Sequence, residues 1–239
     1  MFDAKRLLDQ FLGGQDGQGG KGGKGGAGEF MKGAGGGALA GGLAAILLGS
    51  KTGREIGGEA LKLGGMAAVG ALAYKAYRDW QAGKEEPAAP PAQQSVPMLP
   101  APSGTPFNPS TESGQQKLAR HLLRAMIAAA KADGNIDAQE QTRIFAEMDK
   151  LPLAADDKAF VMDELRAKLD IDAVAGAAET PEEAAEIYTA SLLAIDVDNA
   201  AERGYLAMLA ARLKLDDALV AHLQQTVAAA AGKVAQPPG

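Results

Sequence analysis

Residues 180–195 read TPEEAAEIYTASLLAI, and the first four of them carry the signals that start a helix. Thr180 can cap the helix, Pro181 suits its first position, and Glu183 stands at its third. Helical periodicity continues on both sides of this stretch, over residues 116–231, and no segment alternates with a period of two. The sequence therefore predicts an all-α domain over residues 116–231.

Six helices are expected in this domain, each with an apolar face that can turn towards a shared core. They cover residues 116–131, 137–150, 154–169, 180–195 and 199–213 and the segment that follows Asp216. About 115 residues are enough to bury a stable core. We therefore predict a bundle of about six helices.

Two acidic segments join pairs of these helices and resemble one another. AAAKADGNIDAQE covers residues 128–140, and LLAIDVDNAAE covers residues 192–202. In each segment an aspartate closes one helix, an acidic or amide residue caps the next helix, and a glutamate follows one turn inside it. Hard cations prefer carboxylate and carbonyl oxygens that converge from a turn, so the pair is a candidate site for a divalent metal ion. The candidate ligands are Asp133, Asp137, Glu140, Asp196, Asp198 and Glu202.

The same acids have a second interpretation, as helix caps and as partners of helix dipoles. An EF-hand is excluded, because Ala138 and Ile144 stand where that calcium loop needs glycine and glutamate. The sequence alone does not choose between a metal site and a set of caps.

The first 115 residues differ in composition from the helical domain. Of the 31 glycines, 23 lie in the first 70 residues, and of the 12 prolines, eight lie between residues 87 and 109. Glycine-rich and proline-rich segments of this kind bury too little surface to fold on their own. The expected parts are an amphipathic start and flexible glycine tract (1–32), an apolar helical region (33–82), a disordered proline-rich linker (83–115), the helical domain (116–231) and a disordered tail (232–239).

Two apolar stretches in this part indicate contact with a membrane. Residues 33–50, GAGGGALAGGLAAILLGS, carry no charge and are just long enough to cross a hydrocarbon core. Their small residues recur every four positions, a spacing that favours close helix pairs in lipid and hence homo-oligomers. A second stretch, from Leu63 to Tyr74, ends in aromatic and basic residues typical of a membrane interface. The alternative is a glycine-rich segment that never enters a bilayer.

An amphipathic helix is also expected over residues 2–12, where it could lie on a membrane surface or on a protein partner.

Composition excludes several classes of function. The chain has no cysteine, so it has neither a thiolate metal site nor a cysteine nucleophile. Its two histidines have no metal ligand at the usual spacing on their own helices, so a zinc hydrolase is not expected. Residues 83–239 carry a net charge of −9, which argues against nucleic acid as a partner. No nucleophile or phosphate-binding loop accompanies the acids, and we therefore expect no enzyme.

The acidic segments carry a resemblance to a known family. The stretches ADGNIDAQE and AIDVDNAAERGYLAMLAARLKL resemble the TerB-like fold of tellurite-resistance proteins. The order of a glycine-rich apolar region, a proline-rich linker and this domain is similar to the YebE-type inner-membrane proteins, which form domain of unknown function family 533. The resemblance implies an all-α domain at the inner (cytoplasmic) membrane that binds divalent metal on an acidic face. In this chain Asp133 and Glu140 match the first motif, and Asp196 and Glu202 match the second.

One function is expected, with two alternatives. We expect a membrane-tethered, non-enzymatic domain whose acidic loops bind a divalent cation. It would act as a sensor or scaffold in envelope or metal stress, with protein partners and with its C-terminal domain in the cytoplasm. The alternatives are a structural oligomerisation protein whose acids serve only as helix caps, and an enzyme that uses paired carboxylates to activate a metal.

Overall fold

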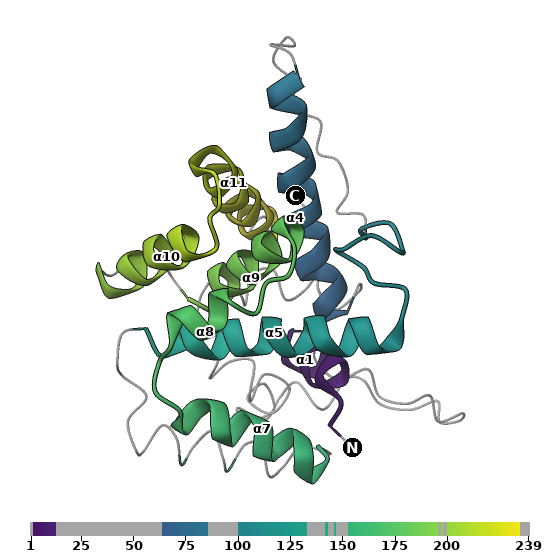
Figure 1. Cartoon of the computed structure of the whole chain (residues 1–239), viewed down its shortest axis with the longest axis vertical. Coiled ribbons are helices and arrows are strands. Elements are labelled where there is room, and N and C mark those ends of the chain that lie inside the picture. Colours follow the sequence, from purple (N-terminus) through teal and green to yellow (C-terminus); the bar gives the residue numbers. More distant parts are fainter. Residues whose placement is uncertain are drawn as a thin grey trace, which may run out of the picture.

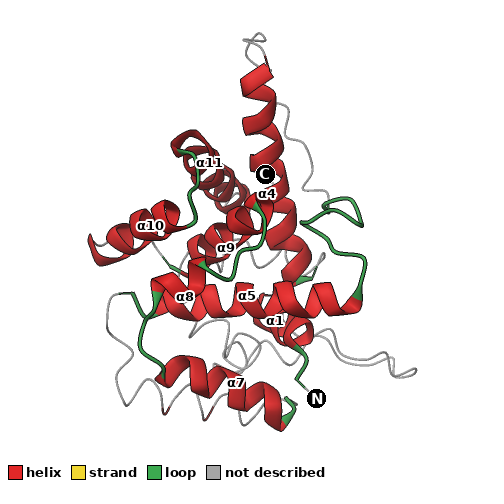
Figure 2. Cartoon of the chain, in the orientation of Figure 1, coloured by secondary structure: helices red, strands yellow, loops and turns green. Residues whose placement is uncertain are grey.

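The computed structural model describes residues 2–12, 64–85, 100–132, 142, 146, 153–195, 197 and 200–234. Within these ranges the chain is helical and has no strand, apart from an isolated bridge between Thr105 and Asn108 (Figure 2). This agrees with the all-α class expected from the sequence. The helices are α1 (Ala4–Leu12), α4 (Gly65–Glu85), α5 (Glu112–Ala130), α7 (Ala155–Arg166), α8 (Ile171–Ala175), α9 (Pro181–Ala194), α10 (Ala200–Arg212) and α11 (Asp217–Val234).

Helix α9 lies at the centre of the fold, in contact with α4, α5, α8, α10 and α11 (Figure 1). Every residue from Glu183 to Ala194 is buried, as expected for a helix that has neighbours on all sides. Its start is the predicted one: the Thr180 hydroxyl accepts a hydrogen bond from the Glu183 N–H at 3.1 Å. The helix ends at Ala194, because Ile195 has extended backbone angles.

Helices α5 and α9 run in the same direction. Lys117 of α5 pairs with Glu179, which stands just before α9. One turn further on, His121 Nδ1 lies 2.6 Å from Glu183 Oε1. Further along both helices, the Ser191 hydroxyl donates to the Ala125 carbonyl oxygen at 3.5 Å. Since these contacts occur in the same order along both helices, the C-terminal ends of α5 and α9 lie at the same end of the pair.

Helix α1 belongs to the same core. Leu7 and Leu8 are fully buried, and the helix contacts α4 and α5. Its start is fixed by the Asp3 N–H, which donates to Asp157 Oδ1 at 2.8 Å. The amphipathic face predicted over residues 2–12 therefore packs on other helices of the chain.

Helix α4 also lies in the core, where it contacts α1, α9 and α11 (Figure 1). Its buried residues include Met66, Val69 and Leu72. The sequence predicted membrane contact for the stretch from Leu63 to Tyr74, with an interfacial anchor at its aromatic and basic end. The structure instead buries the described part of this stretch against the bundle. An apolar helix face is equally suited to lipid and to a protein core, so composition alone did not separate the two environments.

The segment before α5 packs against α4 and differs from the extended spacer that we expected over residues 83–115. Phe107 is buried, and its ring contacts those of Tyr74 and Tyr77 at 5.6 Å between centroids. A turn presents this ring: the Gly104 N–H donates to the Asn108 carbonyl oxygen at 2.8 Å, and Gly104 has a φ of +83°. Residues 86–99 of the expected linker lie outside the described residues.

The remaining helices follow the prediction in part. The expected helices at 116–131, 154–169 and 199–213 and after Asp216 correspond to α5, α7, α10 and α11. The short helix α8 was not predicted; it begins where the Asp170 side chain accepts from the Ala173 N–H at 2.9 Å. Most of the expected helix after Asp137 lies outside the described residues.

Candidate functional site

Five of the six candidate metal ligands lie outside the described part of the chain. These are Asp133, Asp137, Glu140, Asp196 and Asp198. Glu202 is described, and it lies half-buried in the first turn of α10. Among the residues that the structure describes, no group of three or more histidine, aspartate or glutamate side chains could hold a metal ion.

The two acidic segments follow on helices α5 and α9. Asp133 follows three residues after the end of α5, and Asp196 follows two residues after the end of α9. Because α5 and α9 run in the same direction, both acidic segments begin at the same end of this helix pair. The C-terminal end of a helix carries the negative end of its dipole, which favours a nearby cation.

A line of carboxylates runs along α9 from its first turn into the core. Glu183 Oε1 contacts His121 Nδ1, and Glu183 Oε2 accepts from the Glu179 N–H at 2.9 Å. Burial raises the pKa of Glu183, but the hydrogen bonds from His121 and from the Glu179 N–H outweigh it and lower the pKa below its ordinary value.

Glu186, three residues further along α9, is fully buried, and both its carboxyl oxygens lack a hydrogen-bond partner among the described residues. Burial, reinforced by the carboxylates of Glu183 and Glu182, raises the pKa of Glu186 well above its ordinary value. Glu186 is therefore a neutral acid over part of the pH range in which an exposed glutamate is charged.

A groove of about 720 Å³ opens beside the start of α9. Tyr77 and Trp80 of α4 line it, together with Leu213 and Leu219 next to the turn between α10 and α11. The residues between α8 and α9 complete the groove, and most of them are small. Five charged residues also line the groove: Asp172, Glu179, Arg212, Lys214 and Asp216.

Sequence reasoning did not find Glu186 or the groove. Glu186 follows two other glutamates at the start of α9, a position where acids are ordinary. The groove combines residues from α4 and from the turn after α10, more than 130 positions apart, and nothing in the local sequence connects them. An acid within the otherwise uncharged stretch from Ala184 to Ile195 was the one available signal.

The described part of the chain thus defines a helical protein with a central buried helix, a buried acid and a groove lined by aromatic, small and charged residues. The chain belongs to the family described as "Protein of unknown function (DUF533)", which it matches over residues 33–227.

A curated protein of Yersinia enterocolitica, "Uncharacterized protein in ampR 5'region", is similar to this chain. It is 33% identical over 96 residues, which are 40% of this chain and 69% of that protein. No solved structure matches the chain.

No helix in the described ranges is long and apolar enough to cross a membrane. Residues 33–50, for which the sequence predicted membrane contact, lie outside those ranges.

Proposed function

We propose that this chain is a membrane-associated, non-enzymatic protein whose two acidic segments bind one divalent cation between them. The observation that carries the proposal is the common direction of α5 and α9, from which Asp133 and Asp196 follow within three residues of the helix ends. Two negative helix ends and two acidic segments at one end of a helix pair favour a cation there. Cation binding would then bias contacts with protein partners, as in a sensor or scaffold.

The same proposal includes a finer assignment of the fold and of the type of protein. The motifs around Asp133 and Asp196 support a TerB-like fold, and the order of the parts supports a YebE-type inner-membrane protein. Membrane association rests on the uncharged residues 33–50 and their regular small side chains. In this arrangement the helical domain lies on the cytoplasmic side of the inner membrane.

Thermal unfolding of the full chain tests the cation site. The melting temperature is measured with and without millimolar calcium, magnesium, manganese or zinc. An ion present at about a hundred times its dissociation constant adds about 2.7 kcal/mol to the free energy of unfolding. The double variant Asp133→Asn, Asp196→Asn should lose this gain.

A matched control removes two exposed carboxylates elsewhere, Asp163→Asn and Asp217→Asn, and should keep the gain. If none of the ions raises the melting temperature, the acids are helix caps and the proposal is wrong.

Vesicle binding tests the membrane part. The full chain should sediment with vesicles, and a chain that lacks residues 33–50 should stay in the supernatant. Equal sedimentation of both chains would contradict the role given to that stretch.

A further inference from the structure

Residues 100–108, which we call the strap, form a turn that lies beside α4 shortly before α5 begins (Figure 1). Two of its residues, Ala101 and Phe107, are buried, and most of the others are exposed. Its hydrogen bonds are internal, as where the Asn108 side-chain amide donates to the Ala101 carbonyl oxygen at 3.0 Å. Among the described residues no hydrogen bond joins the strap to α4 or α9. The strap can therefore move while both helices stay in place.

The Phe107 carbonyl oxygen and the Glu186 carboxyl group lie against the same glycine. A Cβ atom on Gly70 would lie 2.6 Å from the Phe107 oxygen and 3.2 Å from Glu186 Oε1, so these two oxygens lie near one another. Glu186 is fully buried, and neither of its carboxyl oxygens has a partner in the described ranges. No described N–H group donates to the Phe107 carbonyl oxygen either. The strap thus presents an unbonded acceptor to an unbonded acid.

The proton on Glu186 decides whether this contact attracts or repels. A protonated carboxyl group is a donor and can supply the hydrogen bond that the Phe107 carbonyl lacks. An ionised carboxylate only accepts, so it leaves two acceptors side by side and a bare charge in the core. Moving the strap admits water to Glu186 and breaks no hydrogen bond to either helix.

The groups around Glu186 favour its neutral form. Burial, followed by the carboxylates of Glu183 and Glu182, raises the pKa of Glu186 well above its ordinary value. His121 of α5 bonds to Glu183, and Tyr77 of α4 lies beside Glu182. These two groups therefore act on Glu186 through its neighbouring carboxylates.

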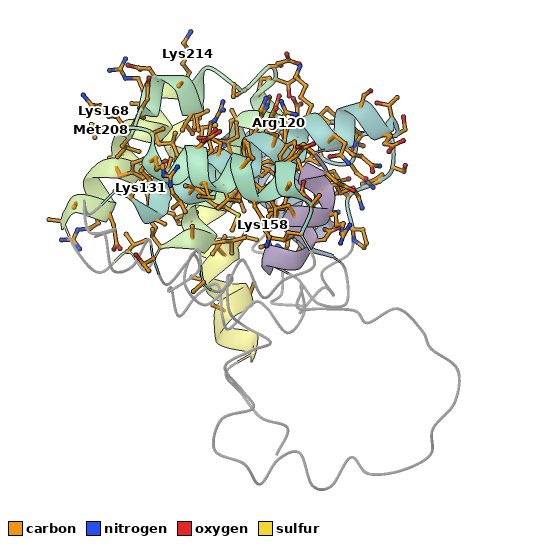
Figure 3. The ribbon with its side chains drawn as sticks, turned by 90° about the horizontal axis from the view of Figure 1, so that it is seen from below. Arg120, Lys131, Lys158, Lys168, Met208 and Lys214 are labelled. Atoms are coloured by element: carbon orange, nitrogen blue, oxygen red, sulfur yellow. The ribbon has the colours of Figure 1, made fainter. Side chains whose placement is uncertain are left out.

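No cation compensates the charge of Glu186 in the part of the chain that the structure describes. None of the ion pairs there includes it. Helices α8, α10 and α11, which also pack on α9, place no charged group against it. Lys168 and Lys214 lie at the outer edge of the molecule (Figure 3). Only a proton or water can therefore satisfy this acid.

We propose that the strap opens and closes with pH: it stays closed while Glu186 carries its proton, and it opens when Glu186 passes that proton to water. In the closed state the acid donates to the Phe107 carbonyl oxygen. In the open state Phe107 leaves the rings of Tyr74 and Tyr77 and exposes them. The strap therefore closes in acid and opens as the pH rises. It is separate from the acidic segments, so this proposal stands or falls independently of the cation site.

Thiol labelling of the full chain tests the movement, because the chain has no cysteine of its own. Ala101→Cys places a thiol at a buried position of the strap, and Ser103→Cys places one at an exposed position of the same strap. N-ethylmaleimide, an uncharged reagent, is applied at a series of pH values. The ratio of the two labelling rates removes the pH dependence of the thiol itself.

This ratio should rise by up to about tenfold per pH unit between 4.5 and the folded pKa of Glu186, because opening is coupled to the loss of one proton. In a Glu186→Gln background the ratio should stay low and constant, since the amide donates at every pH. Glu112→Gln removes an exposed carboxylate of α5 and should leave the rise unchanged. Ala125→Cys, at a fully buried position of α5, reports on unfolding of the whole bundle and should label far more slowly than Ala101→Cys.

Cleavage by chymotrypsin after Phe107 repeats the test without an added cysteine. This ring is buried while the strap is closed, so the protease cuts there only after opening. In mildly alkaline buffer the unaltered chain should be cut at Phe107 about tenfold faster than Glu186→Gln. The proposal is overturned if the two chains are cut there at the same rate, or if the ratio of labelling rates does not change with pH. It is also overturned if that ratio rises equally in Glu186→Gln, or if Ala125→Cys labels as fast as Ala101→Cys.

Discussion

Gly70 of α4 packs against the Glu186 side chain of α9 and against the turn at Phe107. A Cβ atom on Gly70 would lie 3.2 Å from Glu186 Oε1 and 2.6 Å from the Phe107 carbonyl oxygen. The second distance is shorter than side-chain carbons ever approach a backbone atom, so the absence of a side chain at Gly70 allows α4 to dock. The buried acid Glu186 and the backbone of the Phe107 turn therefore both lie against Gly70.

Replacing Gly70 with alanine should destabilise the fold. The new methyl group forces α4 or the Phe107 turn to shift, and overpacking of this kind costs about 1–3 kcal/mol. The gain in helix propensity, about 1 kcal/mol, offsets only part of this cost. Urea unfolding of the full chain measures the difference.

Gly83, near the end of the same helix, provides the matched control. A Cβ atom there meets nothing within 4 Å, so Gly83→Ala should stabilise the chain by about 0.5–1 kcal/mol. If both alanine variants raise, or both lower, the free energy of unfolding, the close contact at Gly70 is not what prevents a side chain at that position.

Glu186→Gln should stabilise the chain at neutral pH and less so in acid. The folded pKa of Glu186 is raised above its ordinary value of 4.5, so above that pH the unfolded chain loses this proton while the folded chain keeps it. The free energy of unfolding therefore falls as the pH rises from 4.5 to the folded pKa. Glutamine keeps the shape of the neutral acid without this penalty.

Urea unfolding at a series of pH values measures the effect. The advantage of Glu186→Gln over the unaltered chain should grow by up to about 1.4 kcal/mol per pH unit in that window. The exposed Glu112→Gln variant is the control for removing a carboxylate at another site. An advantage that stays constant with pH would show that Glu186 is ionised in the folded protein.

The His121 and Glu183 pair should contribute to stability across α5 and α9. Their side chains are only 13% and 12% exposed, so His121→Ala leaves a nearly buried carboxylate without its partner. We expect a loss of about 1.5–3 kcal/mol. His222→Ala should change stability by less than about 0.5 kcal/mol, because among the described residues His222 bonds only to the Ala218 carbonyl oxygen of its own helix.

Lowering the pH should remove part of the stability that the pair of His121 and Glu183 contributes. The folded pKa of Glu183 is lowered from its ordinary value of 4.5, so its stabilisation is present above that pH and is lost as the pH falls through the folded pKa. The difference between His121→Ala and the unaltered chain should therefore shrink as the pH falls below 4.5. A difference that does not shrink in that window would contradict the pairing.

The sequence predicted the features of this fold that depend on residues close together along the chain. The start of α9 follows from Thr180 and Pro181, which act within one turn of the chain. The position of α4 could not be predicted in the same way, because its apolar face fits lipid and protein equally well. The buried state of Glu186 depends on α4 and on the turn at Phe107, which only the tertiary packing brings to it. The acidic segments were visible as a repeated pattern, whereas the groove exists only where distant segments meet.

Lys214→Gly should make the chain more stable although it removes a charged side chain. Lys214 ends α10 in the left-handed region, at a φ of +55°, where a side chain costs about 1–2 kcal/mol relative to the right-handed region. Glycine removes this strain, but it also gives the unfolded chain more freedom, so the net gain is about 0.5–1 kcal/mol. Lys168→Gly changes the same residue type at a position without positive φ, and there the added freedom of the unfolded chain should lower stability.

Urea unfolding of the two variants side by side measures the contrast. A loss of stability in Lys214→Gly would mean that the lysine side chain makes a favourable contact in the folded state.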